Sequence, residues 1–191
     1  MNRSELLKFL PKNSIGAELG VYLGEFSQEI LDSVHPKKLY LIDVWDFIEL
    51  SYQDKLMRNH KSQYNNYRTV LKKFYNITEV FMIKEKTNIV SKIFPNEYFD
   101  WVYIDADHSY EGCLDDLINC DKLVKTTGLI LGHDYDKNSF PGVVKAVHEF
   151  INSRGYFLTY ITTEKKCSTY VISKLESIDI NFKKIINPNI S

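Results

Sequence analysis

Short apolar runs alternate with segments of helical periodicity along most of the chain. Each run is apolar on successive residues, as expected for a strand that is buried on both faces of a parallel sheet. The alternation predicts an α/β, Rossmann-like, doubly wound fold with helices on both faces of a mostly parallel sheet. The expected strands are Ile15–Leu19, Leu39–Ile42, Glu79–Ile83, Phe99–Ile104 and Gly128–Leu131.

Three of the segments that follow these strands carry apolar residues at helical spacing. The last of the three opens with Pro141, which a first helical turn tolerates, and Gly155 can end it. The apolar stripes are Phe26, Ile30, Leu31 and Val34, then Leu114, Leu117, Ile118 and Val124, and finally Val143, Val144, Val147, Phe150 and Ile151.

The pattern changes after Gly155. Two apolar runs, Tyr156–Ile161 and Ser168–Ile172, are separated only by a short polar turn. A connection of this length joins antiparallel strands, so we expect a C-terminal hairpin to close the sheet.

At 191 residues the chain suits one domain, 1–191, with a core at about 15–173 and a peripheral tail at 174–191. The polar segment 46–66 precedes an expected helix at Tyr67–Phe74. We expect this segment to be a lid over a site, a substrate-facing helix, or a surface connection without a role.

Charge and cysteine content narrow the function classes. The chain has 24 Lys+Arg against 25 Asp+Glu and a net charge of -1, which predicts no nucleic-acid partner. Cys113, Cys120 and Cys167 show neither C-x-x-C spacing nor a histidine pair for zinc, and their odd number favours a reducing compartment. No secretory signal or membrane-length apolar run is present, so we expect a cytoplasmic protein without a membrane partner. Whether it forms a homo-oligomer stays open.

The run A-E-L-G-V-Y-L-G lies at the junction of the first strand and the first helix. Gly20 permits a turn in which a ligand approaches the main chain, and the following helix offers unpaired N–H groups. Glu18 adds a negative charge that suits an ammonium group and opposes a pyrophosphate. The alternative is a turn that needs small residues, Gly20 and Gly24, for packing alone.

Asp43 ends the second strand, some two dozen positions after the turn. A carboxylate at this place can accept both hydroxyls of a ribose. Asp43 therefore indicates an adenosine-containing cofactor without choosing which one.

A second polar group follows the fourth and fifth strands, which deliver Asp105, Asp107 and His108, and then His133 and Asp134. These strand ends should meet at the ligand-binding edge of the sheet. Asp105 and Asp134, with His133 as a third ligand, would then hold Mg²⁺, or Mn²⁺ if the imidazole joins, and leave His108 free as a general base. Alternatively, Asp105 and Asp134 cap the helices that follow and the histidines pack nearby.

These motifs, together with the closing hairpin, resemble a class I S-adenosylmethionine-dependent methyltransferase. More narrowly the chain is similar to the sugar and macrolide O-methyltransferases, and distantly to catechol O-methyltransferase. The resemblance implies a seven-stranded sheet with the last strand inserted antiparallel. The chain departs from the pattern of these enzymes at Tyr22, where many of them have a glycine, and at His133, where they usually have an acidic or amide residue.

The resemblance also implies residue roles, in which Glu18 contacts the methionine part of the cofactor, Asp43 the ribose, and Thr87 and Asn88 flank the adenine. The expected cofactor-binding residues are Glu18, Gly20, Gly24, Asp43, Thr87, Asn88 and Asp105; the catalytic residues are His108 and Asp105; and the metal ligands are Asp105, Asp134 and His133.

The sequence thus predicts methyl transfer from S-adenosylmethionine to a small polyhydroxylated acceptor such as a sugar, assisted by a divalent cation. Trp45, Tyr110 and Tyr135 are either a stacking surface for this acceptor or core residues. One rival is a nicotinamide-dependent oxidoreductase, which would require a G-x-G-x-x-G turn that the chain lacks. The other is a non-catalytic cofactor-binding protein that keeps the fold without the chemistry.

Overall fold

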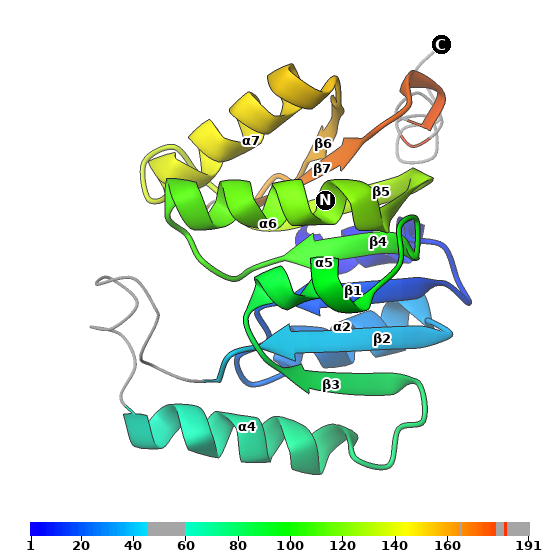
Figure 1. Cartoon of the computed structure of the whole chain (residues 1–191), viewed down its shortest axis with the longest axis vertical. Coiled ribbons are helices and arrows are strands. Elements are labelled where there is room, and N and C mark those ends of the chain that lie inside the picture. The colour runs from blue at the N-terminus through cyan, green and yellow to red at the C-terminus, as the bar shows by residue number, and fades with distance from the viewer. Residues whose placement is uncertain (46–59, 165, 179–181, 183–191) are drawn as a thin grey trace.

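The computed structural model describes residues 1–45, 60–164, 166–178 and 182. They form one seven-stranded sheet in the order β3-β2-β1-β4-β5-β7-β6 (Figure 1). The strands are β1 (Ile15–Leu19), β2 (Lys38–Asp43), β3 (Val80–Lys84), β4 (Phe99–Ile104), β5 (Val124–Tyr135), β6 (Phe157–Ile161) and β7 (Ser168–Ser173).

Strand direction follows the expected pattern. The pairs among β3, β2, β1, β4 and β5 are parallel. The last strand, β7, lies between β5 and β6 and is antiparallel to both. The predicted α/β sheet, its C-terminal hairpin and its inserted last strand are therefore confirmed.

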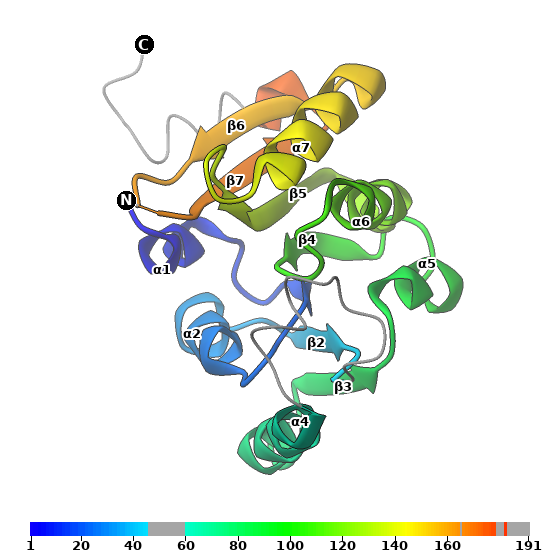
Figure 2. The ribbon, with the colours of Figure 1, turned by 90° about the vertical axis from the view of Figure 1, so that its left-hand side faces the viewer.

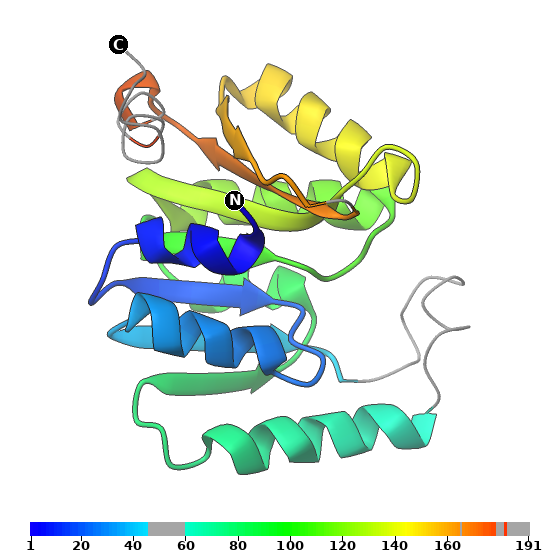
Figure 3. The same cartoon turned by 180° about the vertical axis from the view of Figure 1, so that it is seen from behind.

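Helices cover both faces of the sheet, as Figures 2 and 3 show from the side and from behind. Two separate clusters of buried side chains lie between the sheet and these helices. On one face lie α1 (Arg3–Leu6), the 3₁₀ turn η1 (Leu7–Phe9), α2 (Glu25–Val34) and α4 (His60–Phe74), and on the other η2 (Thr87–Ile89), α5 (Val90–Ile93), α6 (Tyr110–Leu123) and α7 (Pro141–Arg154).

Successive side chains of a central strand point to opposite clusters. In β2, Leu39 and Leu41 pack with α2, whereas Tyr40 and Ile42 pack on the other face. This is why the central strands are apolar on consecutive residues. The edge strand β3 differs, since it has a neighbouring strand on one side only and leaves 39% of Phe81 exposed. The expectation that this strand is buried on both faces is wrong.

Several predicted boundaries also require correction. The fifth strand begins at Val124 and not at Gly128, so Val124 belongs to a strand rather than to the preceding helix. Ile118 is 39% exposed and lies off the buried stripe of α6. The helix expected at Tyr67 begins at His60, so residues 60–66 of the predicted lid segment are helical. The rest of that segment, residues 46–59, lies outside the described residues.

The core extends beyond the predicted range of 15–173. Asn2 caps α1 through a capping box with Glu5. Leu6 and Leu7 are completely buried in the same cluster as α2. From the predicted tail, Phe182 is buried with its ring 6.5 Å from that of Phe9. Among the helices of the described residues, none combines the length and the apolar character needed to cross a bilayer.

The orientation of α6 can be tested with two neighbouring residues. Leu117 is completely buried, whereas Ile118 points outward. Leu117→Ala should lower the free energy of unfolding by about 2–5 kcal/mol, because it removes buried methyl groups and leaves a cavity. Ile118→Ala should lower it by less than about 1 kcal/mol. Urea unfolding of both variants checks this, and equal losses would contradict the assigned helix face.

Candidate functional site

The site lies where β1, β2 and β4 end side by side. Leu19 is paired with Ile42 of β2 and with Ile104 of β4. The backbone bonds continue one residue further, with Gly20 N–H donating to Ile42 O at 2.9 Å and Asp105 N–H to Leu19 O at 2.7 Å. Gly20, Asp43 and Asp105 are thereby brought together at one edge of the sheet, as predicted.

Gly20 is required by two independent constraints. Its φ of +87° is disfavoured for residues with a side chain. A Cβ atom at this position would lie 2.0 Å from the carbonyl oxygen of Asp105. The turn after β1 therefore packs directly against the backbone that leaves β4.

The carboxylate of Asp43 holds this turn in place. Its Oδ2 accepts hydrogen bonds from the backbone N–H groups of Val21 and Tyr22 at 2.8 and 2.9 Å, and Oδ1 accepts one from Trp45 N–H at 2.8 Å. A carboxylate has about four acceptor positions, so these three donors leave one. The prediction that Asp43 accepts the hydroxyls of a ribose stays untested.

Tyr22 takes the left-handed conformation, with φ of 54°. This conformation explains why many relatives have a glycine here. The backbone N–H of Tyr22 donates to Asp43, and the carbonyl of Tyr22 accepts a hydrogen bond from Trp45 Nε1 at 3.0 Å. Trp45 is only 2% exposed, so of the two readings of this residue the core reading is the correct one.

A cavity of about 310 Å³ opens at these strand ends. It is of a size that suits a small ligand. It contains the predicted residues Gly20, Asp43, Thr87, Asn88 and Asp105. The full lining of the described residues is Gly20, Tyr22, Asp43, Val44, Lys86, Thr87, Asn88, Asp105, Ala106, Asp107, Gly112, Asp115 and Asp116.

The charge of the cavity wall distinguishes between cofactors. Five of the lining residues are aspartates, and one is a lysine. Such a wall attracts a cationic ligand and repels a dianionic pyrophosphate. S-adenosylmethionine carries a sulfonium and an ammonium group, so the cavity suits it better than a nicotinamide dinucleotide.

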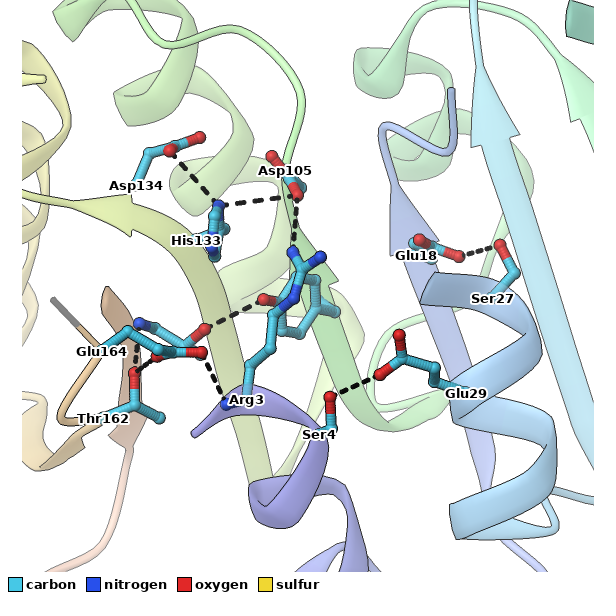
Figure 4. Close-up of polar contacts among 12 residues, drawn as sticks. Arg3, Ser4, Glu18, Ser27, Glu29, Asp105, His133, Asp134, Thr162 and Glu164 are labelled. Atoms are coloured by element: carbon cyan, nitrogen blue, oxygen red, sulfur yellow. Dashed lines mark hydrogen bonds and ion pairs between the residues drawn. The ribbon is translucent and has the colours of Figure 1, made fainter. Parts of the chain in front are cut away.

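Glu18 lies beneath the turn and is not among the described residues that line the cavity. It is 2% exposed, and Ser27 of α2 donates a hydrogen bond to its Oε2 at 2.5 Å (Figure 4). Burial raises the pKa of Glu18 to about 8, against the opposing effect of the Ser27 bond. A pKa in this range favours the protonated form of Glu18 at neutral pH, and both its negative charge and its contact with the cofactor stay predictions.

The structure explains why a glycine stands at position 24. It is the N-cap of α2 with φ of +70°, and a Cβ atom would lie 2.8 Å from the Phe74 ring. Its carbonyl accepts a hydrogen bond from Lys73 Nζ at 2.8 Å. Because Gly24 is also outside the described lining, the packing alternative explains it, and its predicted role in cofactor binding stays untested.

Beside the cavity, Asp105 lies near His133 and Asp134, as Figure 4 shows, and His108 belongs to the same group. His133 Nδ1 lies 3.2 Å from Asp134 Oδ1 and 3.8 Å from Asp105 Oδ2. His108 Nε2 lies 2.7 Å from Asp134 Oδ2 and 3.6 Å from Asp105 Oδ1. Ligand atoms of Asp105, His108 and Asp134 lie within 4.8 Å of one another.

His108 is thus paired with a carboxylate, and its role as a general base that does not bind the metal stays a prediction. Asp134 has a φ of 58°, so the chain turns sharply at the end of β5, and its carboxylate pairs with His108. Burial tends to raise the pKa of Asp134, but hydrogen bonds from His108 and His133 outweigh burial and hold it well below its usual range. A carboxylate partner of this kind orients an imidazole and increases its basicity.

The helix-cap alternative is excluded by the structure. The N-cap of α6 is Ser109, whose Oγ accepts a hydrogen bond from Gly112 N–H at 3.0 Å. The N-cap of α7 is Phe140. Neither Asp105 nor Asp134 caps the helix that follows it.

Two residues of the site escaped the sequence analysis. Arg3 Nη1 lies 3.7 Å from Asp105 Oδ2, and its guanidinium is 4.6 Å from the ring centre of Phe26 (Figure 4). No sequence signal connects Arg3 with a strand end so far along the chain. Asp116 left a signal, since this carboxylate interrupts the buried stripe of α6.

The fold and the acidic cavity define a class I S-adenosylmethionine-dependent methyltransferase. The family model for a methyltransferase domain matches residues 17–135, which is more than half of the chain. The chain belongs to this methyltransferase family. No curated protein sequence matches it.

Several solved structures have a similar fold. A protein from Streptococcus mutans, described as a methyltransferase in complex with SAH, is 15% identical with a TM-score of 0.62 over 90% of this chain and 95% of that one. A Clostridium thermocellum protein described as an rRNA methylase is 14% identical, with a TM-score of 0.64 over 91% and 93%. Spermidine synthase from Thermotoga maritima is 16% identical with a TM-score of 0.62. The match covers 98% of this chain but only 65% of the spermidine synthase chain. At these identities the likeness concerns the fold alone.

The raised pKa of Glu18 predicts how stability depends on pH. Between its ordinary pKa of 4.5 and the folded value of about 8, the folded chain binds more protons at Glu18 than the unfolded chain. The Glu18 contribution to the free energy of unfolding therefore falls as pH rises through this window. Glu18→Gln removes this dependence, so the stability of the variant relative to wild type should rise by roughly 2–5 kcal/mol from pH 5 to pH 8, at about 1.4 kcal/mol per pKa unit.

Urea unfolding at pH 5, 6.5 and 8 measures this difference. Glu25→Gln, an exposed position on α2, the helix that carries Ser27, serves as the control and should follow wild type at each pH. Parallel pH profiles for Glu18→Gln and wild type would show that Glu18 is ionised in the folded protein.

Proposed function

We propose that this protein transfers the methyl group of S-adenosylmethionine to a hydroxyl oxygen of a small polyhydroxylated acceptor such as a sugar. The observation that carries the proposal is the cluster of Asp105, His108 and Asp134, within 4.8 Å of one another at the rim of the acidic cavity. Asp105 belongs to both the cluster and the lining of the cavity, so the cofactor and the acceptor would meet beside it. The narrower relation to sugar and macrolide O-methyltransferases rests on the sequence resemblance.

The residues of the cluster supply the groups that O-methylation requires. As the acceptor oxygen attacks the methyl carbon, the carbon–sulfur bond breaks and its electron pair stays on sulfur, which gives S-adenosylhomocysteine. His108 takes the hydroxyl proton as general base, and Asp134 stabilises the imidazolium that results. The sulfonium is already a strong methyl donor, so alignment supplies much of the remaining acceleration.

The donor atoms of Asp105, His108 and Asp134 lie close enough together to hold a divalent cation. If His108 serves as the base, Asp105 and Asp134 would hold the cation with His133, whose Nδ1 lies near both carboxylates. An oxygen-rich set of this kind suits Mg²⁺, or Mn²⁺ when an imidazole takes part. A cation held there would lower the pKa of an acceptor hydroxyl and orient it.

Two other functions compete with this proposal: methylation of RNA, and binding of the cofactor without catalysis. The expectation that nucleic acid is not a partner has no support from the structural neighbours, because one of them is described as an rRNA methylase. Against an RNA acceptor stand the net charge of -1 and the five aspartates of the cavity wall. The other rival is a protein that binds the cofactor without turnover, against which the Asp134–His108 pair argues.

A screen of acceptors tests the proposal. When the protein is incubated with S-adenosylmethionine, Mg²⁺ and a sugar or another polyhydroxylated compound, S-adenosylhomocysteine should form. Addition of EDTA should lower the rate of its formation. Methylation of RNA but of none of these small molecules would overturn the proposed acceptor class. A metal-independent rate would overturn the cation, and binding of NADH instead of S-adenosylhomocysteine in calorimetric titration would overturn the cofactor.

His108 can be tested separately from cofactor binding. His108→Ala should lower kcat by about 10²–10⁴-fold, because it removes the general base. The affinity for S-adenosylhomocysteine should stay nearly unchanged, since His108 is outside the described lining of the cavity. The matched control is His148→Ala, whose imidazole contacts the exposed hydroxyl of Tyr135 at 2.9 Å and should leave both quantities unchanged. Full activity of His108→Ala would exclude it as the base.

A further inference from the structure

The carboxylate of Asp105 is surrounded by three nitrogen atoms that stay beyond hydrogen-bond distance (Figure 4). Its Oδ2 lies 3.7 Å from Arg3 Nη1 and 3.8 Å from His133 Nδ1, and its Oδ1 lies 3.6 Å from His108 Nε2. A direct N–H···O bond spans about 2.7–3.2 Å. Asp134 differs, because the same two histidines approach its oxygens to 2.7 and 3.2 Å. Asp105 therefore has donors around it and a gap between itself and each of them.

Arg3 is fixed in place and remains open to a ligand. Its backbone N–H donates to Glu164 Oε1 at 2.7 Å, and its guanidinium lies 4.6 Å from the ring centre of Phe26 and donates a hydrogen bond to the hydroxyl of Tyr103. A guanidinium has five N–H donors, so these contacts leave donors for a ligand. The side chains of Arg3 and Asp105 are 32% and 26% exposed, so a ligand can reach both.

The gap between the guanidinium and the carboxylate restricts the chemistry of a group that fills it. Such a group must accept a hydrogen bond from Arg3 and donate one to Asp105. A hydroxyl does both. A carboxylate or phosphate has no proton for Asp105, and an ammonium group has no lone pair for Arg3. The pair therefore fits a neutral hydroxyl group.

The two oxygens of Asp105 face different parts of the site. Oδ1 faces His108, the proposed general base, whereas Oδ2 faces Arg3. One carboxylate can accept hydrogen bonds from two neighbouring hydroxyls of a sugar ring. A hydroxyl at Oδ1 lies beside the base and is the one to be methylated. The hydroxyl on the adjoining carbon then lies at Oδ2, beside Arg3.

We propose that Arg3, together with Asp105, binds a hydroxyl group of the acceptor that neighbours the one to be methylated. This inference rests on the proposed function, because it assumes a polyhydroxylated acceptor with His108 as its base. It makes Arg3 a specificity-determining residue, which favours acceptors with two neighbouring hydroxyls over those with an isolated one.

The first test removes the guanidinium. Arg3→Met keeps an unbranched side chain over Phe26 and leaves the backbone bond to Glu164 in place. The acceptor is the best substrate among D-glucose, D-galactose and myo-inositol, assayed for formation of S-adenosylhomocysteine at saturating S-adenosylmethionine and Mg²⁺. Arg3→Met should raise KM about 10–100-fold and change kcat less than about threefold, because a bond from a charged donor to the bound acceptor is lost. Arg3→Lys should give an intermediate KM, since it keeps the charge without the planar fork.

The second test removes the hydroxyl. NMR of the product identifies the methylated position, and monodeoxy analogues then lack one or the other neighbouring hydroxyl. For one of these analogues the KM of wild type should rise about tenfold or more, whereas the KM of Arg3→Met should change less than about threefold, because the partner is already absent. A purely structural role of Arg3 would not produce this coupling.

Lys8→Met is the matched control, because it removes an exposed cation from the turn that follows α1, and it should leave KM and kcat unchanged. An unchanged KM in Arg3→Met, a fall in kcat alone, or additive effects of the two changes would overturn the role of Arg3 and leave the proposed function intact. If Arg3→Met fails to fold, Arg3→Lys with the deoxy analogues provides the same comparison. If folded wild type methylates no polyhydroxylated compound, the proposed function is overturned instead.

Discussion

The cavity depends on one buried carboxylate, that of Asp43. Three backbone N–H groups, from Val21, Tyr22 and Trp45, converge on its two oxygens. These bonds fix the turn after β1 in a conformation that is unfavourable for Tyr22, and they join it to the segment after β2. Because the turn also packs on the carbonyl of Asp105, the same carboxylate indirectly sets the distance between the cavity and the cluster of Asp105, His108 and Asp134.

The site combines two electrostatic environments that share Asp105. On the cavity side, aspartates outnumber cations and favour the sulfonium and ammonium groups of the cofactor. Beside the cavity, His108, His133 and Arg3 surround two carboxylates, so these carboxylates have nitrogen partners close by. S-adenosylhomocysteine lacks the sulfonium charge of S-adenosylmethionine, so an acidic cavity would attract it less.

Much of the fold and part of the site could be predicted from the sequence, because both rest on local patterns. Consecutive apolar residues marked the central strands, and the rule that parallel strands end at one edge brought Gly20, Asp43 and Asp105 together. What could not be predicted depends on tertiary contacts. The pairing of His108 with Asp134 depends on the backbone conformation of Asp134, and the raised pKa of Glu18 depends on its burial beneath the turn. Arg3 reaches Asp105 only through the packing of α1 against α2 and the C-terminal hairpin.

That packing has a consequence for how the site is assembled. The backbone N–H of Arg3 donates to Glu164 Oε1 at 2.7 Å, and the N–H of Thr163 donates to the carbonyl of Met1 at 3.0 Å. The first helix is thus fastened to the turn between the two last strands. The position of Arg3 therefore rests in part on contacts between residues more than 160 positions apart, and contacts of such long range form slowly. Loss of the Glu164 bond would loosen the helix that places the guanidinium beside Asp105, so a turn at the far end of the chain takes part in positioning it.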